Sequence, residues 1–111
     1  MLRESSVNKV LGLFLMLPLL AFAADDVFTI QIKNHRFEPA ELTVPAGKKV
    51  KLLVENLDAT PEEFESHELN REKVIAGNSK ATIYIGPLSA GKYPFFGEFN
   101  EATAQGVILI K

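Results

Sequence analysis

Apolar and polar residues alternate along most of the chain after residue 26. The clearest case is residues 27–33, where Phe28, Ile30 and Ile32 fall on one face and polar side chains on the other. A period of two residues predicts a half-buried β-strand. Short apolar or alternating runs predict further strands over 41–44, 49–56, 72–75, 80–85, 92–96 and 107–110. Turn residues separate these runs at spacings near ten residues, which is typical of an antiparallel β-sandwich. We therefore expect an all-β sandwich of seven or eight strands.

Residues 60–69 allow two interpretations. Thr60-Pro61-Glu62-Glu63 has the form of a capping box with proline at the first helical position, which would start a helix running towards Lys73. Residues 63–69 also alternate loosely between apolar and polar side chains. We favour a strand or an irregular segment, because the flanking elements are all strands.

The first 23 residues have the pattern of a signal peptide. A weakly basic start is followed by an apolar run from Val10 to Phe22, and the run ends in the small-x-small sequence Ala21-Phe22-Ala23. We expect residues 1–23 to be removed and residues 24–111 to form one β-domain in the periplasm, without direct insertion into a membrane.

Charge and sulfur content narrow the possible functions. The formal net charge of the whole chain is −2, and the signal segment carries more basic than acidic residues. The remaining acidic domain lacks the basic face that nucleic acid requires, so we expect no nucleic-acid partner. The chain has no cysteine, and both methionines, Met1 and Met16, lie in the signal segment. The mature domain is therefore predicted to contain no sulfur ligand.

Three motifs in order resemble the cupredoxins. Residues 37–50 resemble the F-x-P-x-x-(apolar)-x-V-x-x-G-x-x-V signature, and residues 56–61 resemble the loop before the first copper histidine. Tyr93 to Gly106 is similar to the Y-x-F-x-C-x-x-H-x-x-M-x-G ligand loop. The resemblance covers nearly the whole mature domain. It implies a Greek-key sandwich with a metal-binding end formed by these loops.

The copper ligands of that pattern are missing. A blue-copper site uses a cysteine thiolate, two histidines and a weak axial methionine. The matching positions hold Glu62 or Glu63, Gly97, Glu101 or Ala102, and Gln105. We therefore expect no blue-copper site.

A narrower resemblance concerns residues 60–66, 69–73, 85–88 and 95–99. These segments are similar to a periplasmic subgroup of cupredoxin-like proteins associated with bacterial iron-permease systems. The resemblance implies a site of carboxylates and histidine that binds copper, or iron as a second candidate, and assists ferrous-iron oxidation or delivery. It also implies an iron permease or another periplasmic iron-uptake component as partner.

The candidate metal ligands follow from this architecture, in which the end of the first strand lies beside the ligand loops. Carboxylates suit iron, manganese and calcium, and an added imidazole extends the range to Cu(II). His67 is a second, peripheral candidate beside Glu63 and Glu65, which share its face if the segment is a strand. The full set is His35, Glu62, Glu63, Glu98, Glu101 and His67. Each of these glutamates could equally be solvated surface.

Two functional hypotheses result. The first is a periplasmic metal-binding accessory protein of iron uptake with a non-blue carboxylate and histidine site. The alternative is a metal-free interaction module whose altered loop end docks a permease or a partner domain, since a fold does not fix function. An enzyme in the usual sense is the least supported class, because the sequence shows no nucleophile–base arrangement; metal-dependent ferrous oxidation remains open.

Overall fold

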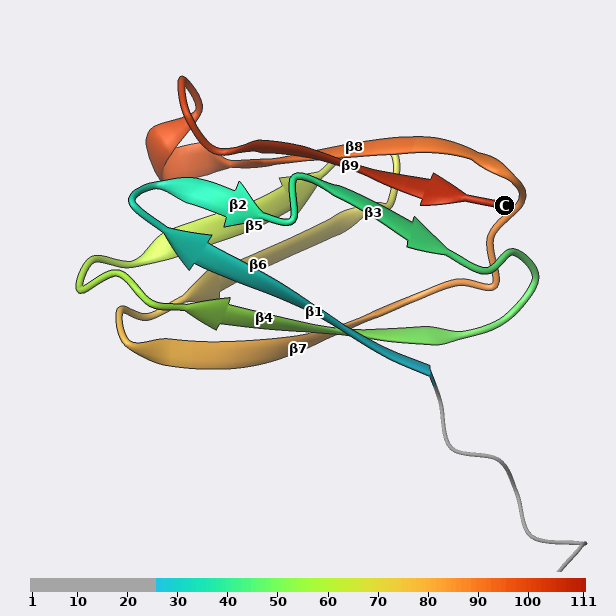
Figure 1. Ribbon diagram of the computed structural model, residues 1–111, viewed down its shortest axis with the longest axis horizontal. Coiled ribbons are helices and arrows are strands. Elements are labelled where there is room, and N and C mark those ends of the chain that lie inside the picture. Colours follow the sequence, from blue (N-terminus) through green and yellow to red (C-terminus); the bar gives the residue numbers. More distant parts are fainter. Residues whose placement is uncertain (1–25) are drawn as a thin grey trace, which may run out of the picture.

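The computed structural model describes residues 26–111, which fold into two β-sheets stacked face to face (Figure 1). The expected signal segment lies outside the described residues. Within 26–111, no helix is long and apolar enough to cross a membrane. The strands are β1 (Asp26–Lys33), β2 (Arg36–Glu38), β3 (Glu41–Val44), β4 (Val50–Asn56), β5 (Glu62–Ser66), β6 (Arg71–Ile75), β7 (Ser79–Ile85), β8 (Gly91–Gly97) and β9 (Gln105–Ile110).

The strand order is β2-β1-β4-β7 in one sheet and β3-β9-β8-β5-β6 in the other. The predicted β-sandwich is confirmed, with nine strands where seven or eight were expected. Two pairs, β1 with β4 and β3 with β9, run parallel, and the other pairs are antiparallel. Each parallel pair joins strands that are separated in the sequence, so the alternation of single strands could not reveal them.

The additional strand arises from a tight turn after β1. Asn34 and His35 both have positive φ, 53° and 57°, which reverses the chain in two residues and pairs β2 with β1. Asp58 stabilises this turn, because its carboxylate accepts the backbone N–H groups of Asn34 at 2.8 Å and His35 at 2.9 Å. These hydrogen bonds hold the pKa of Asp58 below its ordinary value. The turn is thereby tied to the loop that follows β4.

The ambiguous segment forms a strand. β5 covers Glu62–Ser66 and pairs with β6 over its whole length and with β8 at Phe64 and Glu65. The capping-box sequence starts no helix, because pairing on both sides satisfies the backbone of β5 while its alternate residues are buried. Tertiary context therefore decides the conformation here.

The core consists of the inward faces of both sheets. Phe37, Phe64 and Phe95 fill the end nearest the loop after β8, with ring centroids 4.9 Å apart for Phe64–Phe95 and for Phe37–Phe95. All three side chains are at most 3% exposed. The other large buried aliphatic residues include Ile30, Ile32, Val50, Leu52, Val54, Ile83, Ile85, Ile108 and Ile110.

We predict that Phe95→Ala lowers the free energy of unfolding by about 3–5 kcal/mol, because it empties the centre of the aromatic cluster. Phe99→Ala is the matched control, since the Phe99 side chain is 50% exposed. It should change stability by less than about 0.5 kcal/mol. Urea unfolding of both variants measures the difference, and equal effects would contradict this account of the core.

Candidate metal centre

Strand β5 presents carboxylates on both of its faces. Side chains alternate along a strand, so Glu62 and Phe64 point into the sandwich while Glu63 and Glu65 point outwards. Glu62 is only 1% exposed and Glu63 only 7%. The two faces create two different environments, one inside the sandwich and one on the outer surface of the five-stranded sheet.

On the inner side, the carboxylate of Glu62 is fully occupied by protein donors. Its Oε1 accepts the backbone N–H of Phe99 at 2.9 Å and that of Glu63 at 3.0 Å. Its Oε2 accepts the side-chain amide of Asn100 at 2.7 Å. A buried carboxylate needs such partners, because burying it without them would carry a large free-energy cost. Three donors satisfy it without a cation.

Gly97 makes room for this carboxylate. A Cβ atom at position 97 would lie 2.7 Å from Cδ of Glu62 and 2.7 Å from Cβ of Ala104. The backbone of Gly97 is extended, with φ −96° and ψ 110°, so the glycine is required for space and not for its dihedral angles. A cysteine thiolate at this position and the buried Glu62 carboxylate exclude each other. The residues present therefore do not fit a blue-copper ion at this position.

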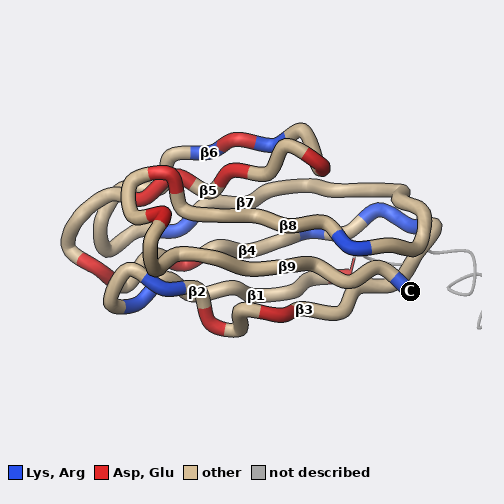
Figure 2. Tube along the Cα trace, turned by 90° about the horizontal axis from the view of Figure 1, so that it is seen from above, with Lys and Arg blue, Asp and Glu red and all other residues tan. Residues whose placement is uncertain are grey.

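The outer side of β5 gathers the other carboxylates. Glu63, Glu65 and Glu98 each place one carboxylate oxygen so that these atoms lie within 4.8 Å of one another. We call these three residues the outer carboxylate centre. Figure 2 shows acidic positions along β5 and β6 and in the loop after β8. Glu72 of β6 stands directly opposite Glu65 in the ladder and adds a fourth carboxylate beside the centre.

The carboxylates of the centre share protons. The hydrogen bond to Glu98 is the main cause that raises the pKa of Glu63 to about 8, followed by burial and by Glu72. The same partner, Glu98, raises the pKa of Glu65. Hydrogen bonds from Glu63 and then Glu65 lower the pKa of Glu98, which is the anionic acceptor. Near neutral pH the centre therefore holds protons where a cation could bind.

One oxygen of the centre has no partner. Oε2 of Glu65 is buried and makes no hydrogen bond with any described residue. None of the salt bridges found within 26–111 involves Glu63, Glu65 or Glu98. An unpaired buried carboxylate oxygen is unusual in a folded protein. The outer carboxylate centre thus takes part in no salt bridge within the described part of the chain.

His67 lies beside the centre but outside the group of atoms within 4.8 Å. Its ring contacts Phe96, with ring centroids 5.6 Å apart. Its ring opposes the rise in the pKa of Glu65 and, as the smallest cause, adds to the lowering of the pKa of Glu98. A hollow of about 180 Å³ adjoins it, lined by Glu65, Ser66, His67, Asn70, Arg71 and Glu72.

His35 and Glu101 lie elsewhere. Nδ1 of His35 is 3.6 Å from a carboxylate oxygen of Asp58, and the backbone oxygen of His35 accepts the Thr103 hydroxyl at 2.6 Å. The turn after β1 is thus beside the loop after β8, as expected, but the imidazole is not part of the centre. Glu101 is exposed, and its backbone oxygen accepts the side-chain amide of Gln105 at 2.7 Å.

The structure therefore brings together Glu63 and Glu98 from the sequence-derived set, with His67 next to them. Glu65, expected only as a companion of His67, is a full member of the centre. Glu72 was missed. The sequence could have revealed Glu72 if the turn at residues 67–70 had been located, because a hairpin about that turn pairs Glu65 with Glu72.

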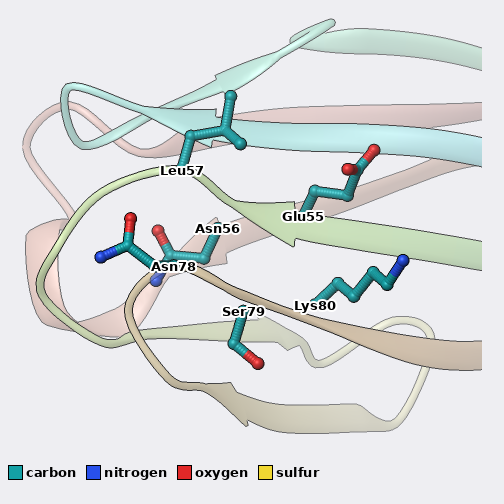
Figure 3. Close-up of a pocket in the computed structure, with 6 residues that line it drawn as sticks. All are labelled: Glu55, Asn56, Leu57, Asn78, Ser79 and Lys80. Atoms are coloured by element: carbon teal, nitrogen blue, oxygen red, sulfur yellow. The ribbon is translucent and has the colours of Figure 1, made fainter.

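A second hollow, larger than the one beside His67, lies apart from these carboxylates. Its volume is about 440 Å³. Figure 3 shows the residues that line it, where β4 ends and β7 begins. Asn56 in its wall has a structural role, because its amide donates to the backbone oxygens of Thr60, Ile75 and Ala76 at 2.9–3.3 Å. Carboxyl groups with strongly shifted pKa values are typical of functional sites, so the outer carboxylate centre, with Glu63, is the stronger candidate.

The two stacked sheets, with parallel β1–β4 and β3–β9 pairs and a loop joining β8 to β9 at one end, define a cupredoxin-type sandwich. The chain belongs to the cupredoxin-like domain family, which matches residues 9–110. A protein of Rickettsia prowazekii (strain Madrid E), the uncharacterized protein RP394, is 46% identical over 81 residues. The match covers 73% of this chain and 65% of that protein, so the chain spans about two thirds of its relative's length.

Solved structures with the same fold include copper proteins. Auracyanin A, a "blue" copper protein from Chloroflexus aurantiacus, superposes with a TM-score of 0.69 at 17% identity, over 79% of this chain and 100% of that one. The metal-binding domain of the Cu(I)-exporting ATPase CopA of Streptococcus pneumoniae D39 gives 0.69 at 15% identity, over 82% and 92%. The purple cupredoxin of Nitrosopumilus maritimus gives 0.58 at 17%, over 75% and 98%. At these identities the likeness establishes the fold alone.

We predict that the stability of the metal-free protein falls as the pH rises from about 4.5 towards about 8. In this window folded Glu63 keeps a proton that the unfolded chain releases, since its pKa moves from 4.5 to about 8 on folding. The raised pKa of Glu65 also makes the protein less stable as the pH rises. The lowered pKa of Glu98 has the opposite effect: it stabilises the folded protein at pH values above the ordinary pKa of a glutamate.

Urea midpoints measured across this range test the prediction. Glu63→Gln cannot ionise, so its midpoint should decline less and should exceed the wild-type midpoint at about pH 8. Glu101→Gln, a charge removal from an exposed position, should follow the wild-type curve. Parallel curves for wild type and Glu63→Gln would show that the carboxylates do not interact as described.

Proposed function

We propose that this protein binds a metal cation at the outer carboxylate centre. The observation that carries the proposal is the convergence of one oxygen each from Glu63, Glu65 and Glu98 within 4.8 Å, together with the buried, unpartnered Oε2 of Glu65. Carboxylates brought this close repel one another and retain protons. A cation would replace those protons and remove the repulsion.

The donor set favours copper first and iron second. Carboxylate oxygens are hard ligands that suit highly charged or hard cations, whereas His67 at the edge of the centre would favour Cu(II), which leads the divalent affinity order. Because the described domain offers no thiolate, bound Cu(II) would lack a blue-copper spectrum. The copper-binding members of the same fold support this choice of metal.

The proposed cellular role is that of a periplasmic accessory protein in iron uptake. The resemblance to proteins associated with iron-permease systems supports this role, with an iron permease or another uptake component as partner. Glu63, Glu65 and Glu98 would hold the copper ion, which as Cu(II) would supply a one-electron acceptor for Fe²⁺. If the same carboxylates held iron instead, their hard anionic oxygens would suit delivery of the more highly charged ion.

A metal-free docking module is the second candidate. It is favoured by Glu62, which closes the loop end of the sandwich with hydrogen bonds alone. The exposed apolar side chains of Phe99 and Val74, 50% and 53% exposed, would then contact the partner. Partner capture by metal-free protein that survives Glu98→Ala and is lost on Phe99→Ser would support this candidate over the first.

We predict that isothermal titration detects Cu(II) binding to residues 24–111 near neutral pH. Glu63→Gln and Glu98→Gln should each weaken it by at least about 10-fold, because each removes an anionic donor. The controls Glu101→Gln and His35→Ala should bind like wild type, since both positions lie outside the centre. Absence of binding by the wild type, or full binding by Glu98→Gln, would refute the proposed function.

We also predict that Cu(II) binding releases protons and strengthens with rising pH. The pKa of Glu63 is raised to about 8, so at lower pH the cation must displace a proton from this carboxyl group. Titrations in buffers of different ionisation enthalpy count the released protons. The count should fall in Glu63→Gln, and an affinity that does not change with pH would rule out displacement of a shared proton.

A further inference from the structure

The buried carboxylate of Glu62 connects the two chain segments that supply the outer carboxylate centre. We infer that Glu62 is a positioning residue for this centre: it binds no cation itself but holds Glu98 where it meets Glu63 and Glu65. The inference rests on the proposed function, because it concerns the assembly of the same metal centre.

Glu62 contacts the residues on both sides of Glu98 in the sequence. The backbone of Phe99, the residue directly after Glu98, donates to Oε1, and the side chain of Asn100 donates to Oε2. Gly97, directly before Glu98, packs against the same carboxylate with no room for a Cβ atom. These contacts fix the short 3-10 turn Glu98–Asn100 on β5, so the backbone that carries Glu98 has a defined position.

The side chain of Glu98 cannot supply this order itself. It is exposed, and its interactions are those with the carboxyl groups of Glu63 and Glu65. Those groups repel it once they lose their protons. The turn that carries Glu98 must therefore be held by other contacts if three carboxylates are to stay together for a cation.

One carboxylate orients both halves of the centre. Oε1 of Glu62 also accepts the backbone N–H of Glu63, at 3.0 Å, next to the bond from Phe99. Glu62 and Phe99 are 37 residues apart in the sequence. The centre is thus assembled from distant segments through a single buried group, in the way that outer partners orient metal ligands in other sites.

The donor pattern shows why glutamate is needed here. A carboxylate accepts at both oxygens, whereas glutamine accepts at one and donates at the other. In Glu62→Gln, the new amide group would face the amide group of Asn100, donor against donor, until the Asn100 amide turned over. In either arrangement the charge-assisted hydrogen bonds to Phe99, Glu63 and Asn100 are lost. In the double variant Glu62→Gln/Asn100→Asp, the direction of this bond is reversed and the net charge of the pair equals that of the wild type.

The test compares Cu(II) binding and the Cu(II) electron paramagnetic resonance spectrum of these variants. Glu62→Gln should bind Cu(II) about 10- to 100-fold more weakly, the range for loss of an orienting partner. Its spectrum should match that of Glu98→Gln, because both lack the Glu98 donor. The double variant should regain wild-type affinity and spectrum, which a general loss of stability would not allow. Glu101→Gln is the control for the loss of one negative charge, since Glu101 lies in the loop that carries Glu98 but outside the outer carboxylate centre.

Amide hydrogen exchange of the metal-free protein gives an independent readout. Exchange across residues 98–104 should accelerate in Glu62→Gln and return to wild-type rates in the double variant. If Glu62→Gln does not fold, Asn100→Ala replaces it, since this half-exposed side chain supplies only one of the three bonds. It should weaken Cu(II) binding and accelerate exchange to a smaller extent.

The outcomes separate this inference from the proposed function. Wild-type Cu(II) affinity, spectrum and exchange rates in Glu62→Gln would overturn the positioning role and leave the metal centre standing. Weak binding that the double variant does not restore would also overturn it. A wild-type protein that binds no Cu(II) would remove the proposed function, and with it the role of Glu62 as a positioning residue.

Discussion

The loop end of this protein depends on one buried carboxylate. Glu62 accepts three hydrogen bonds, two of them from the segment after β8, and it leaves space only for glycine at position 97. In a blue-copper site, a metal ion joins the ligand loop to the body of the sandwich through thiolate and imidazole ligands. Here hydrogen bonds from the protein make that connection. Hydrogen bonds therefore close the end of the sandwich, and the cation site that we propose lies outside it.

Successive side chains of β5 point to opposite faces of the sheet, and this alternation places carboxylates on the outer face as well as inside the sandwich. A step of one residue, from Glu62 to Glu63, moves a carboxylate from a satisfied interior position to a crowded outer one. On that outer face Glu65 stands opposite Glu72, a like-charge pair that destabilises a sheet. Proteins tolerate such conflicts mainly at functional sites, where a bound partner resolves them. Protons shared with Glu98 relieve the conflict in part, and a metal cation would relieve it more completely.

The fold and the chemistry therefore separate in this chain. The sandwich is that of the cupredoxin-like family, and the aromatic cluster of Phe37, Phe64 and Phe95 supports the end of it that carries the loop after β8. The position that the copper thiolate would occupy is held by Gly97 and filled by Glu62. A family likeness thus identifies the relevant end of the molecule, while the residues at that end decide which ligands it offers.

The sequence by itself determined the β-sandwich and the lack of the cysteine that a blue-copper site needs, and it pointed to the loops on which the proposed site depends. These conclusions needed only local information: the two-residue period of strands such as 27–33, the turn residues between them, and the lack of any cysteine. Tertiary structure decided which carboxylates meet. Whether Glu62 or Glu63 points inwards depends on the register of β5 against β6 and β8, and the membership of Glu65 depends on the path of a loop more than thirty residues away. Register and long-range approach are set by packing, which leaves no local pattern in the sequence.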